Sequence, residues 1–161
     1  VKILRQGRAE GRLVGGCLSL LCSAIGTSYD PKTDETILFL EDVKEPPYRI
    51  DHMLTQLKAS GKLRKVRGVL FGPMVQCRPP QGAGDDLEEI ILDVLVDLEV
   101  PILLGVPSGH GEHNVTLPLG IRVRVSALRE GLGGGEARDL LSLEEEAVSV
   151  TPGDGAPGAA F

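Results

Sequence analysis

The sequence predicts an α/β domain, and three patterns support that prediction. Short apolar runs typical of buried strands, such as Ile37 to Leu40, alternate with segments whose apolar residues recur every three or four positions, as in helices. The part after about residue 114 alternates apolar and polar residues instead, which is typical of antiparallel strands with one exposed face. The chain of 161 residues has the size of one domain, since domains most often contain about 100–150 residues.

The first half of the chain is expected to contain two strands and two helices. Arg8 to Val14 predicts a short strand, and the two glycines after it lead into the apolar stretch CLSLLCSAIG, which predicts a short buried helix. Ile37 to Leu40 predicts a strand buried on both faces. Pro46 and Pro47 open a second helix that ends near Gly61. Its core stripe follows the i, i+3, i+4, i+7 pattern and comprises Ile50, Met53, Leu54 and Leu57.

The second half continues the alternation and ends in strands. Val66 to Phe71 predicts a strand, and Asp85 or Asp86 is placed to cap the helix that follows. The apolar stripe of that helix comprises Leu87, Ile90, Ile91, Val94 and Leu98. Ile102 to Leu104 predicts the next strand. Antiparallel strands at an edge or in a second sheet are then predicted from the interleaving of Ile121, Val123 and Val125 with Arg122, Arg124 and Ser126.

Composition excludes several classes of protein. The formal net charge of −6 and the dispersed basic residues argue against a nucleic-acid surface, which requires clustered Lys and Arg. The one dense basic run follows a glycine and favours a solvated turn; it comprises Lys62, Arg64, Lys65 and Arg67. No apolar stretch approaches the ~18 residues of a membrane span. We therefore expect a soluble protein that binds neither nucleic acid nor membranes.

The cysteines and the two ends of the chain indicate its setting. Cys17, Cys22 and Cys77 form no CxxC pair and are odd in number, which favours buried thiols in a reducing compartment. The chain begins with Val and shows no signal peptide, which suggests a piece of a longer protein. The final stretch, TPGDGAPGAAF, offers little to bury. We expect one domain over residues 1–150 and a disordered tail over 151–161.

Two motifs invite a ligand and have simpler interpretations. GLGGGE at 131–136 lacks the strand and helix context of a dinucleotide site and the Lys of a Walker motif, so a flexible hairpin turn is favoured. PSGHGEH offers His110, Glu112 and His113, and HxxH can present two ligands to zinc. Yet this stretch lies among Pro and Gly rather than on a helix, and no distant third ligand is evident. The sequence therefore favours neither a phosphate nor a metal site.

The clearest chemical signal is an acidic pair and a distant histidine. Glu41 and Asp42 directly follow a buried strand, which is costly unless the carboxylates are paired or lie in a cleft, and ligand crevices form at the carboxyl ends of strands. Two interpretations stay open: hydrogen bonding to the N-terminus of the next helix at Tyr48 to Ile50, or catalysis. His110, between two glycines, is placed to project its imidazole into a cleft. Together Glu41 and His110 supply two members of a catalytic triad.

Four ordered blocks carry a resemblance to a known family. They are GRLVGGCLSLLCSAIGTSYD, ILFLEDVKEPPYRIDHMLTQLKASGKL, VRGVLFG and VPILLGVPSGHGEHNVTLPLG. This succession resembles the C-terminal half of the LD-carboxypeptidases, the serine peptidases that include muropeptide LD-carboxypeptidase and the microcin C immunity hydrolase. The resemblance extends from about Ala9 to about Val148. It implies a swivelling β/β/α fold.

The resemblance also implies site residues. The family uses a Ser, Glu, His triad, and its Glu in the LED block and His in the GH block match Glu41 and His110. His110 is then the general base, and Glu41 holds its tautomer. The family's nucleophilic serine lies in a GxSD-type turn of an N-terminal domain, which these residues lack. Supporting family positions match Asp42, Glu45, Tyr48, Arg49 and Asp51, whereas none of Ser19, Ser23 and Ser108 lies in such a turn.

The implied reaction is hydrolysis of the amide between an L-centred residue, typically the diamino acid of a cell-wall peptide, and a terminal D-alanine. The resemblance implies a murein tetrapeptide-like substrate, no metal or organic cofactor, a cytoplasmic location and a homodimer. In one departure, Cys17 stands where the family reads GGN, which affects site geometry or substrate preference.

Two alternatives remain. One is a hydrolase of peptidyl-nucleotide antibiotics with the same triad. The other is a non-catalytic module that binds peptides or a partner, which predicts a mostly polar surface where an enzyme domain would expose an apolar interface.

Overall fold

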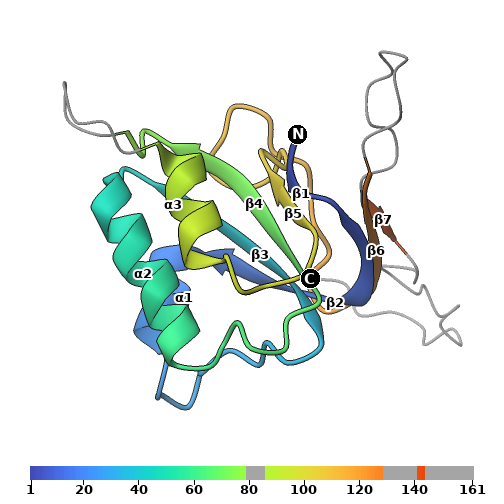
Figure 1. Ribbon diagram of the computed structural model, residues 1–161, viewed down its shortest axis with the longest axis horizontal. Coiled ribbons are helices and arrows are strands. Elements are labelled where there is room, and N and C mark those ends of the chain that lie inside the picture. The colour runs from blue at the N-terminus through green and yellow to red at the C-terminus, as the bar shows by residue number, and fades with distance from the viewer. Residues whose placement is uncertain (79–85, 129–140, 144–161) are drawn as a thin grey trace, which may run out of the picture.

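The computed structural model describes residues 1–78, 86–128 and 141–143. They confirm the α/β class: three helices lie beside a curled sheet of seven strands in the order β1-β5-β4-β3-β2-β6-β7 (Figure 1). The helices are α1 (Leu18–Ala24), α2 (Pro47–Ala59) and α3 (Leu87–Val94). The strands are β1 (Lys2–Arg5), β2 (Gly7–Cys17), β3 (Thr36–Val43), β4 (Gly68–Val75), β5 (Ile102–Leu104), β6 (Arg122–Ala127) and β7 (Leu141–Leu143).

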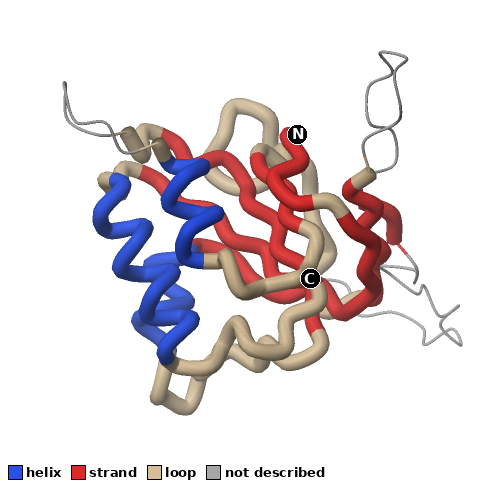
Figure 2. The backbone as a smooth tube through the Cα atoms, viewed as in Figure 1, coloured by secondary structure: helices blue, strands red, loops and turns tan. Residues whose placement is uncertain are grey.

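The centre of the sheet is parallel, and helices cover one of its faces. β2, β3, β4 and β5 run in the same direction, and α1, α2 and α3 connect them in turn. Because the strands follow one another in order across the sheet, right-handed connections place all three helices on the same side (Figure 2). The parallel strands therefore end at one common edge of the sheet.

Alternation along β3 divides the core into two layers. Leu38 and Leu40 belong to the cluster beneath the helices, whereas Ile37 and Phe39 belong to the cluster on the opposite face. All four side chains are buried, as their unbroken apolar run predicts. The second cluster is covered by β6 and by the stretch that precedes it, through Val123, Val125, Leu117 and Ile121.

Antiparallel strands complete both sides of the sheet. β6 pairs with β2, β7 pairs with β6, and β1 pairs with β5. The alternating region after residue 120 therefore extends the same sheet, as one of the two predicted arrangements requires. The sequence does not predict β1, because four residues are too few to display a period and its partner β5 lies about 100 positions away.

Most predicted elements are confirmed, with changed ends. α2 begins at Pro47 and buries its predicted stripe, β5 has its predicted bounds, and Asp86 caps α3 by accepting a hydrogen bond from the Glu88 backbone N–H at 3.0 Å. β3 extends to Val43, so Glu41 and Asp42 lie within the strand, not after it. α3 ends at Val94, so Leu98 lies beyond it. Pairing to neighbouring strands lengthens β3, which a local pattern does not reveal.

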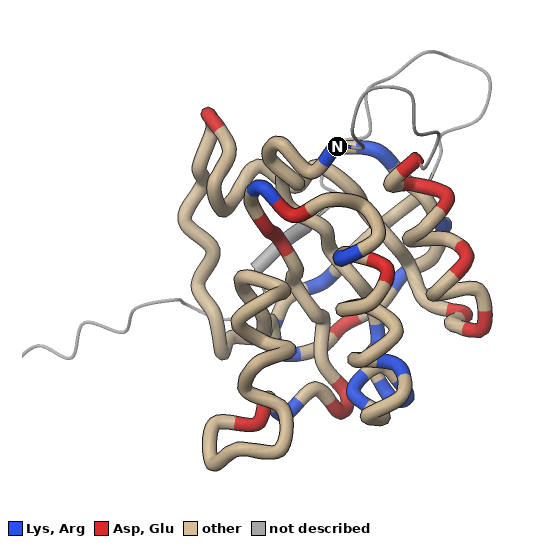
Figure 3. The backbone as a smooth tube through the Cα atoms, turned by 90° about the vertical axis from the view of Figure 1, so that its left-hand side faces the viewer, with Lys and Arg blue, Asp and Glu red and all other residues tan. Residues whose placement is uncertain are grey.

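The basic run lies mostly in a turn, as predicted, and three of its side chains form ion pairs with acids of the loop before β3. Lys62 contacts Asp30 at 2.6 Å, Lys65 contacts Asp34 at 2.9 Å, and Arg67 pairs with Glu35. Basic and acidic positions thus lie among one another (Figure 3). Within the described ranges, no helix has the length and apolarity needed to cross a bilayer. The glycine-rich segment 131–136 and the predicted tail 151–161 lie outside the described residues.

Candidate catalytic site

Glu41 lies near the carboxyl end of β3, opposite an irregularity in β4. On one side it pairs with Cys17 at the end of β2. On the other side the register shifts between Leu40 and Asp42, so Glu41 alone faces the two residues Gly72 and Pro73. The extra residue belongs to β4 and increases the local twist there. Strand alternation places Glu41 on the same side as Phe39, the face that carries no helices.

The connection from β5 to β6 brings His110 over this edge of the sheet. The backbone N–H groups of Gly105 and Val106 both donate to the Phe71 carbonyl, at 2.8 and 3.0 Å. Further along, the Val115 N–H donates to the Pro107 carbonyl at 2.6 Å. The first two bonds fasten the start of the loop to the middle of β4, and the third closes the loop on itself around His110.

Glu41 and His110 form a direct pair. The Glu41 Oε2 atom lies 2.6 Å from His110 Nδ1 and also accepts a hydrogen bond from the His110 backbone N–H at 3.2 Å. The Glu41 side chain is 6% exposed, whereas the His110 side chain is 51% exposed. With Nδ1 occupied by the carboxylate, Nε2 is the ring atom left for a reacting group. The arrangement is that of a base and its orienting acid.

The neighbouring carboxylates favour the protonated imidazole. The hydrogen bond that the His110 ring donates to Glu41 raises the pKa of His110 above its ordinary value of 6.5, and the charge of Glu41 adds to this effect. Partial burial opposes the shift, and the charge of Asp42 reinforces it. An imidazole so placed holds a proton more firmly, as a base that must accept one requires.

Two glycines enclose the Glu41 side chain. A Cβ on Gly109 would lie 2.7 Å from Glu41 Cγ and Oε2, and Gly109 also has a φ of +111°. A Cβ on Gly72 would lie 2.8 Å from Glu41 Cβ and 2.7 Å from the Ser108 carbonyl oxygen. Only glycine fits at either position without displacement. Sequence reasoning missed Gly72; its signal is a glycine inside an apolar strand, which often marks close approach of another backbone.

Asp42 has a different environment from Glu41. It is 2% exposed, its Oδ2 accepts a hydrogen bond from the Ser19 backbone N–H, and its Oδ1 accepts one from the Val43 N–H, both at 2.8 Å. Of the two interpretations of this acidic pair, hydrogen bonding therefore applies to Asp42. The helix N-terminus it contacts is that of α1, whereas the example expected from the sequence was the next helix, at Tyr48 to Ile50.

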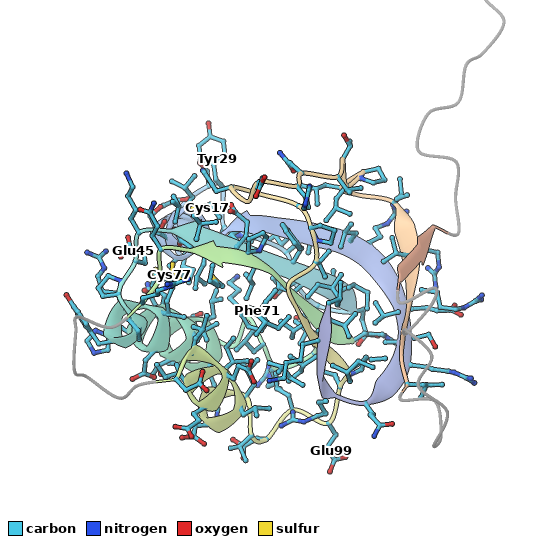
Figure 4. All side chains as sticks on the ribbon, turned by 90° about the horizontal axis from the view of Figure 1, so that it is seen from above. Cys17, Tyr29, Glu45, Phe71, Cys77 and Glu99 are labelled. Atoms are coloured by element: carbon cyan, nitrogen blue, oxygen red, sulfur yellow. The ribbon has the colours of Figure 1, made fainter. Side chains whose placement is uncertain are left out.

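Cys17, the strand partner of Glu41, has its Sγ atom 3.1 Å from Ser19 Oγ and is half-buried, where a buried thiol was predicted. Cys22 and Cys77 are buried as predicted. The labelled Cys17, at the end of β2, and Cys77, beyond β4, lie toward the same side of the molecule in Figure 4.

The remaining candidate positions lie apart from the Glu41 and His110 pair. The supporting positions on α2 interact locally: Arg49 with Glu45 at 2.8 Å, the Tyr48 ring with His52, and Asp51 with Thr55. None of the hydrogen bonds of Ser19, Ser23 or Ser108 goes to His110. Across the described ranges, no three His, Cys, Asp or Glu residues gather as metal ligands would; Glu112 and His113 are exposed.

Sequence relatives share this domain. A family model described as the LD-carboxypeptidase C-terminal domain matches residues 10–125. A putative carboxypeptidase of Synechocystis sp. is 41% identical over 122 residues, which cover 75% of this chain and 40% of the relative. A probable murein peptide carboxypeptidase of Bacillus subtilis is 39% identical over 124 residues, which cover 76% of this chain and 39% of the relative. The chain thus spans about two fifths of the length of these relatives.

Solved structures agree with the sequence relatives. A muramoyltetrapeptide carboxypeptidase from Oxalobacter formigenes has a TM-score of 0.68 and 34% identity, and the match covers 75% of this chain and 42% of that protein. The microcin C7 self-immunity protein MccF, solved with aspartyl sulfamoyl adenosine, has a TM-score of 0.75 and 25% identity over 89% of this chain and 40% of that protein. The family match over more than half of the residues and the shared fold lead to one conclusion: the chain belongs to the LD-carboxypeptidase family, as its C-terminal domain.

Proposed function

We propose that this domain is part of a serine LD-carboxypeptidase that removes a terminal D-alanine from murein peptides by cleaving its amide bond to an L-centred diamino acid. The observation that carries the proposal is the 2.6 Å contact between the buried Glu41 carboxylate and the half-exposed His110 imidazole. The names of the Bacillus and Oxalobacter relatives support a murein peptide as the substrate class.

In the proposed mechanism, His110 Nε2 accepts the proton of the nucleophilic serine hydroxyl as the serine attacks the scissile carbonyl. The same atom then returns the proton to the leaving amine. Glu41 keeps the other ring nitrogen protonated and stabilises the imidazolium that forms between the two steps. The half-exposed ring is placed for this exchange, because its Nδ1 edge contacts Glu41 while the rest remains accessible.

The nucleophile is proposed to come from an N-terminal domain outside these 161 residues. The difference in length from the relatives supports this, because the match covers 40% and 39% of two of them. Exposed apolar side chains also support a covered surface: Val115 and Leu119 are 55% and 54% exposed on the connection that carries His110, and Leu20 on α1 is 68% exposed. These exposures favour the enzyme domain over the non-catalytic binding module, which predicts a polar surface here.

Hydrolysis of a peptidyl nucleotide is the second candidate. MccF of Escherichia coli is 29% identical over 123 residues, against 39% for the Bacillus murein peptide carboxypeptidase, so the murein substrate is preferred. We further propose a cytoplasmic enzyme, because Cys17, Cys22 and Cys77 are all unpaired, which suits a reducing compartment. A homodimer is proposed from the family resemblance alone.

The test uses the domain joined to the N-terminal part of its Bacillus relative, with D-alanine release from a murein tetrapeptide as the assay. We expect release by the joined protein and none by the domain alone, with Glu41→Gln and His110→Ala each lowering the rate by roughly a thousandfold or more. Glu112→Gln and His113→Ala are the controls, because they make the same substitutions at exposed positions of the loop that carries His110. Full activity of the Glu41 and His110 variants would refute the triad. Cleavage of an aspartyl nucleotide in place of the tetrapeptide would favour the second candidate.

A further inference from the structure

Asp42 follows Glu41 directly but serves the opposite face of the sheet. Successive residues of a strand alternate between faces, and Leu40, two positions before Asp42, belongs to the cluster beneath the helices. Glu41 shares its side with Phe39 and meets His110 there. Asp42 instead meets the backbone at the start of α1. Two adjacent carboxylates therefore hold structures on both sides of one strand.

The contact with α1 replaces a missing helix cap. Cys17 occupies the N-cap position of α1, and its side chain makes no capping hydrogen bond. The Ser19 N–H, which an N-cap side chain would ordinarily satisfy, donates to Asp42 Oδ2 at 2.8 Å instead. A carboxylate at this place is also favoured by the helix dipole. Because Asp42 is 2% exposed, its desolvation must be offset by such bonds.

The same contact closes a small ring of contacts next to Glu41. Cys17 is the strand partner of Glu41, and Ser19 lies two residues beyond it. Asp42, one residue beyond Glu41, binds back to Ser19. The end of β2, the start of α1 and the end of β3 are thus fastened together at the position of Glu41. The second oxygen of Asp42 accepts from Val43 N–H and holds its own side chain in place.

We propose that Asp42 is a positioning residue of the hydrolase: by binding Ser19 and Val43 it sets the end of β3 and hence the aim of Glu41 at His110. The inference rests on the proposed function, since its main readout is activity. This positioning role requires both carboxylate oxygens of Asp42 to accept a hydrogen bond. Asn caps helices as well as Asp does, but its amide has only one acceptor oxygen. In Asp42→Asn the amide NH2 group would therefore face one of the two backbone N–H groups, those of Ser19 and Val43, and could not accept its hydrogen bond.

The experiment compares Asp42→Asn and Asp42→Glu with Asp86→Asn in the joined two-domain enzyme. Asp86 is the control, because its side chain also accepts a hydrogen bond from the second backbone N–H of a helix, that of Glu88 in α3 at 3.0 Å, but from an exposed N-cap position. We expect kcat to fall about tenfold to a hundredfold in both Asp42 variants, with a smaller change in KM. A loss of this size is what displacement of a catalytic group by roughly 1 Å produces. Asp86→Asn is expected to keep the kcat of the wild type.

The outcomes separate this inference from the proposed function. If both Asp42 variants retain wild-type kcat while Glu41→Gln loses most of its activity, Asp42 has no positioning role although the triad stands. Wild-type kcat in Asp42→Glu alone would show that charge suffices, and would also overturn the inference. If Glu41→Gln and His110→Ala are fully active, the proposed function itself fails.

The contact between Asp42 and Ser19 can also be tested in the wild-type chain, without variants. Amide hydrogen exchange should find the Ser19 N–H protected, although the second residue of a helix usually lacks an intrahelical partner. Rapid exchange of that amide would contradict the contact on which the inference depends.

Discussion

Replacing Gly109 with Ala tests whether the position of Glu41 depends on an absent side chain. The new Cβ would lie 2.7 to 2.8 Å from the Glu41 Cγ, Oε2 and Cδ atoms, whereas carbon atoms in contact ordinarily stand about 3.5–4.0 Å apart. Relief of the clash therefore needs a displacement of about 1 Å, either of the carboxylate or of the loop that carries His110. A displacement of that size at a reacting group costs about a hundredfold in rate.

Gly120→Ala is the matched control for this substitution. Gly120 also has a positive φ, of +91°, but nothing lies within 4 Å of the place that an added Cβ would take. Both variants carry the backbone penalty of roughly 1–3 kcal/mol, and only Gly109→Ala carries the clash with Glu41. We expect equal losses of free energy of unfolding in urea from the backbone term, and a fall in kcat for D-alanine release in Gly109→Ala alone. Equal kcat values in the two variants would refute the steric argument.

Three further predictions concern the pair and the core. Glu41→Gln should lower kcat by roughly a thousandfold or more. Because Glu41 raises the pKa of His110, the acid limb of the pH profile of kcat/KM should also move to lower pH in this variant. An acid limb that does not move would contradict the pairing of Glu41 with His110. Folding raises the pKa of His110. The free energy of unfolding of the wild type, measured in urea at several pH values, should therefore exceed that of His110→Ala fully below about pH 6.5, and the difference should disappear as pH rises through the folded-state pKa. A difference that grows with pH would contradict the raised pKa. Leu54→Ala, at a fully buried position of α2, should cost about 2–5 kcal/mol in urea unfolding, whereas Leu20→Ala, 68% exposed, should cost less than about 0.5 kcal/mol, and equal costs would argue against the described packing.

Local patterns predicted the elements whose signal is local. The i, i+3, i+4, i+7 spacing predicted α2, and its four core residues are buried. The apolar run of β3 predicted burial on both faces. Both faces are buried, since helices cover one and the second cluster covers the other. The stop of α3 at Val94 was not predicted, since Leu98 continues the apolar period and packs against the core from beyond the helix.

Long-range pairing accounts for what the patterns missed. β1 is a strand because β5 supplies its hydrogen-bond partners, not because of its own four residues. The irregularity opposite Glu41 depends on Gly72 and Pro73 of a different strand. Likewise, hydrogen bonding to a helix N-terminus was one of two interpretations of the acidic pair, but only the position of α1 beside β3 selects Asp42 for it and Ser19 as the partner.

The sequence by itself determined the α/β class, the succession of most helices and strands along the chain and, through its resemblance to the LD-carboxypeptidases, the two residues expected to carry the chemistry. Only the tertiary structure decided that they meet. Glu41 and His110 are 69 positions apart, and their 2.6 Å contact needs the sheet order, the tie of the β5 to β6 connection to Phe71 and two glycines that leave room for a carboxylate. Those conditions are contacts between distant segments, so no local periodicity encodes them.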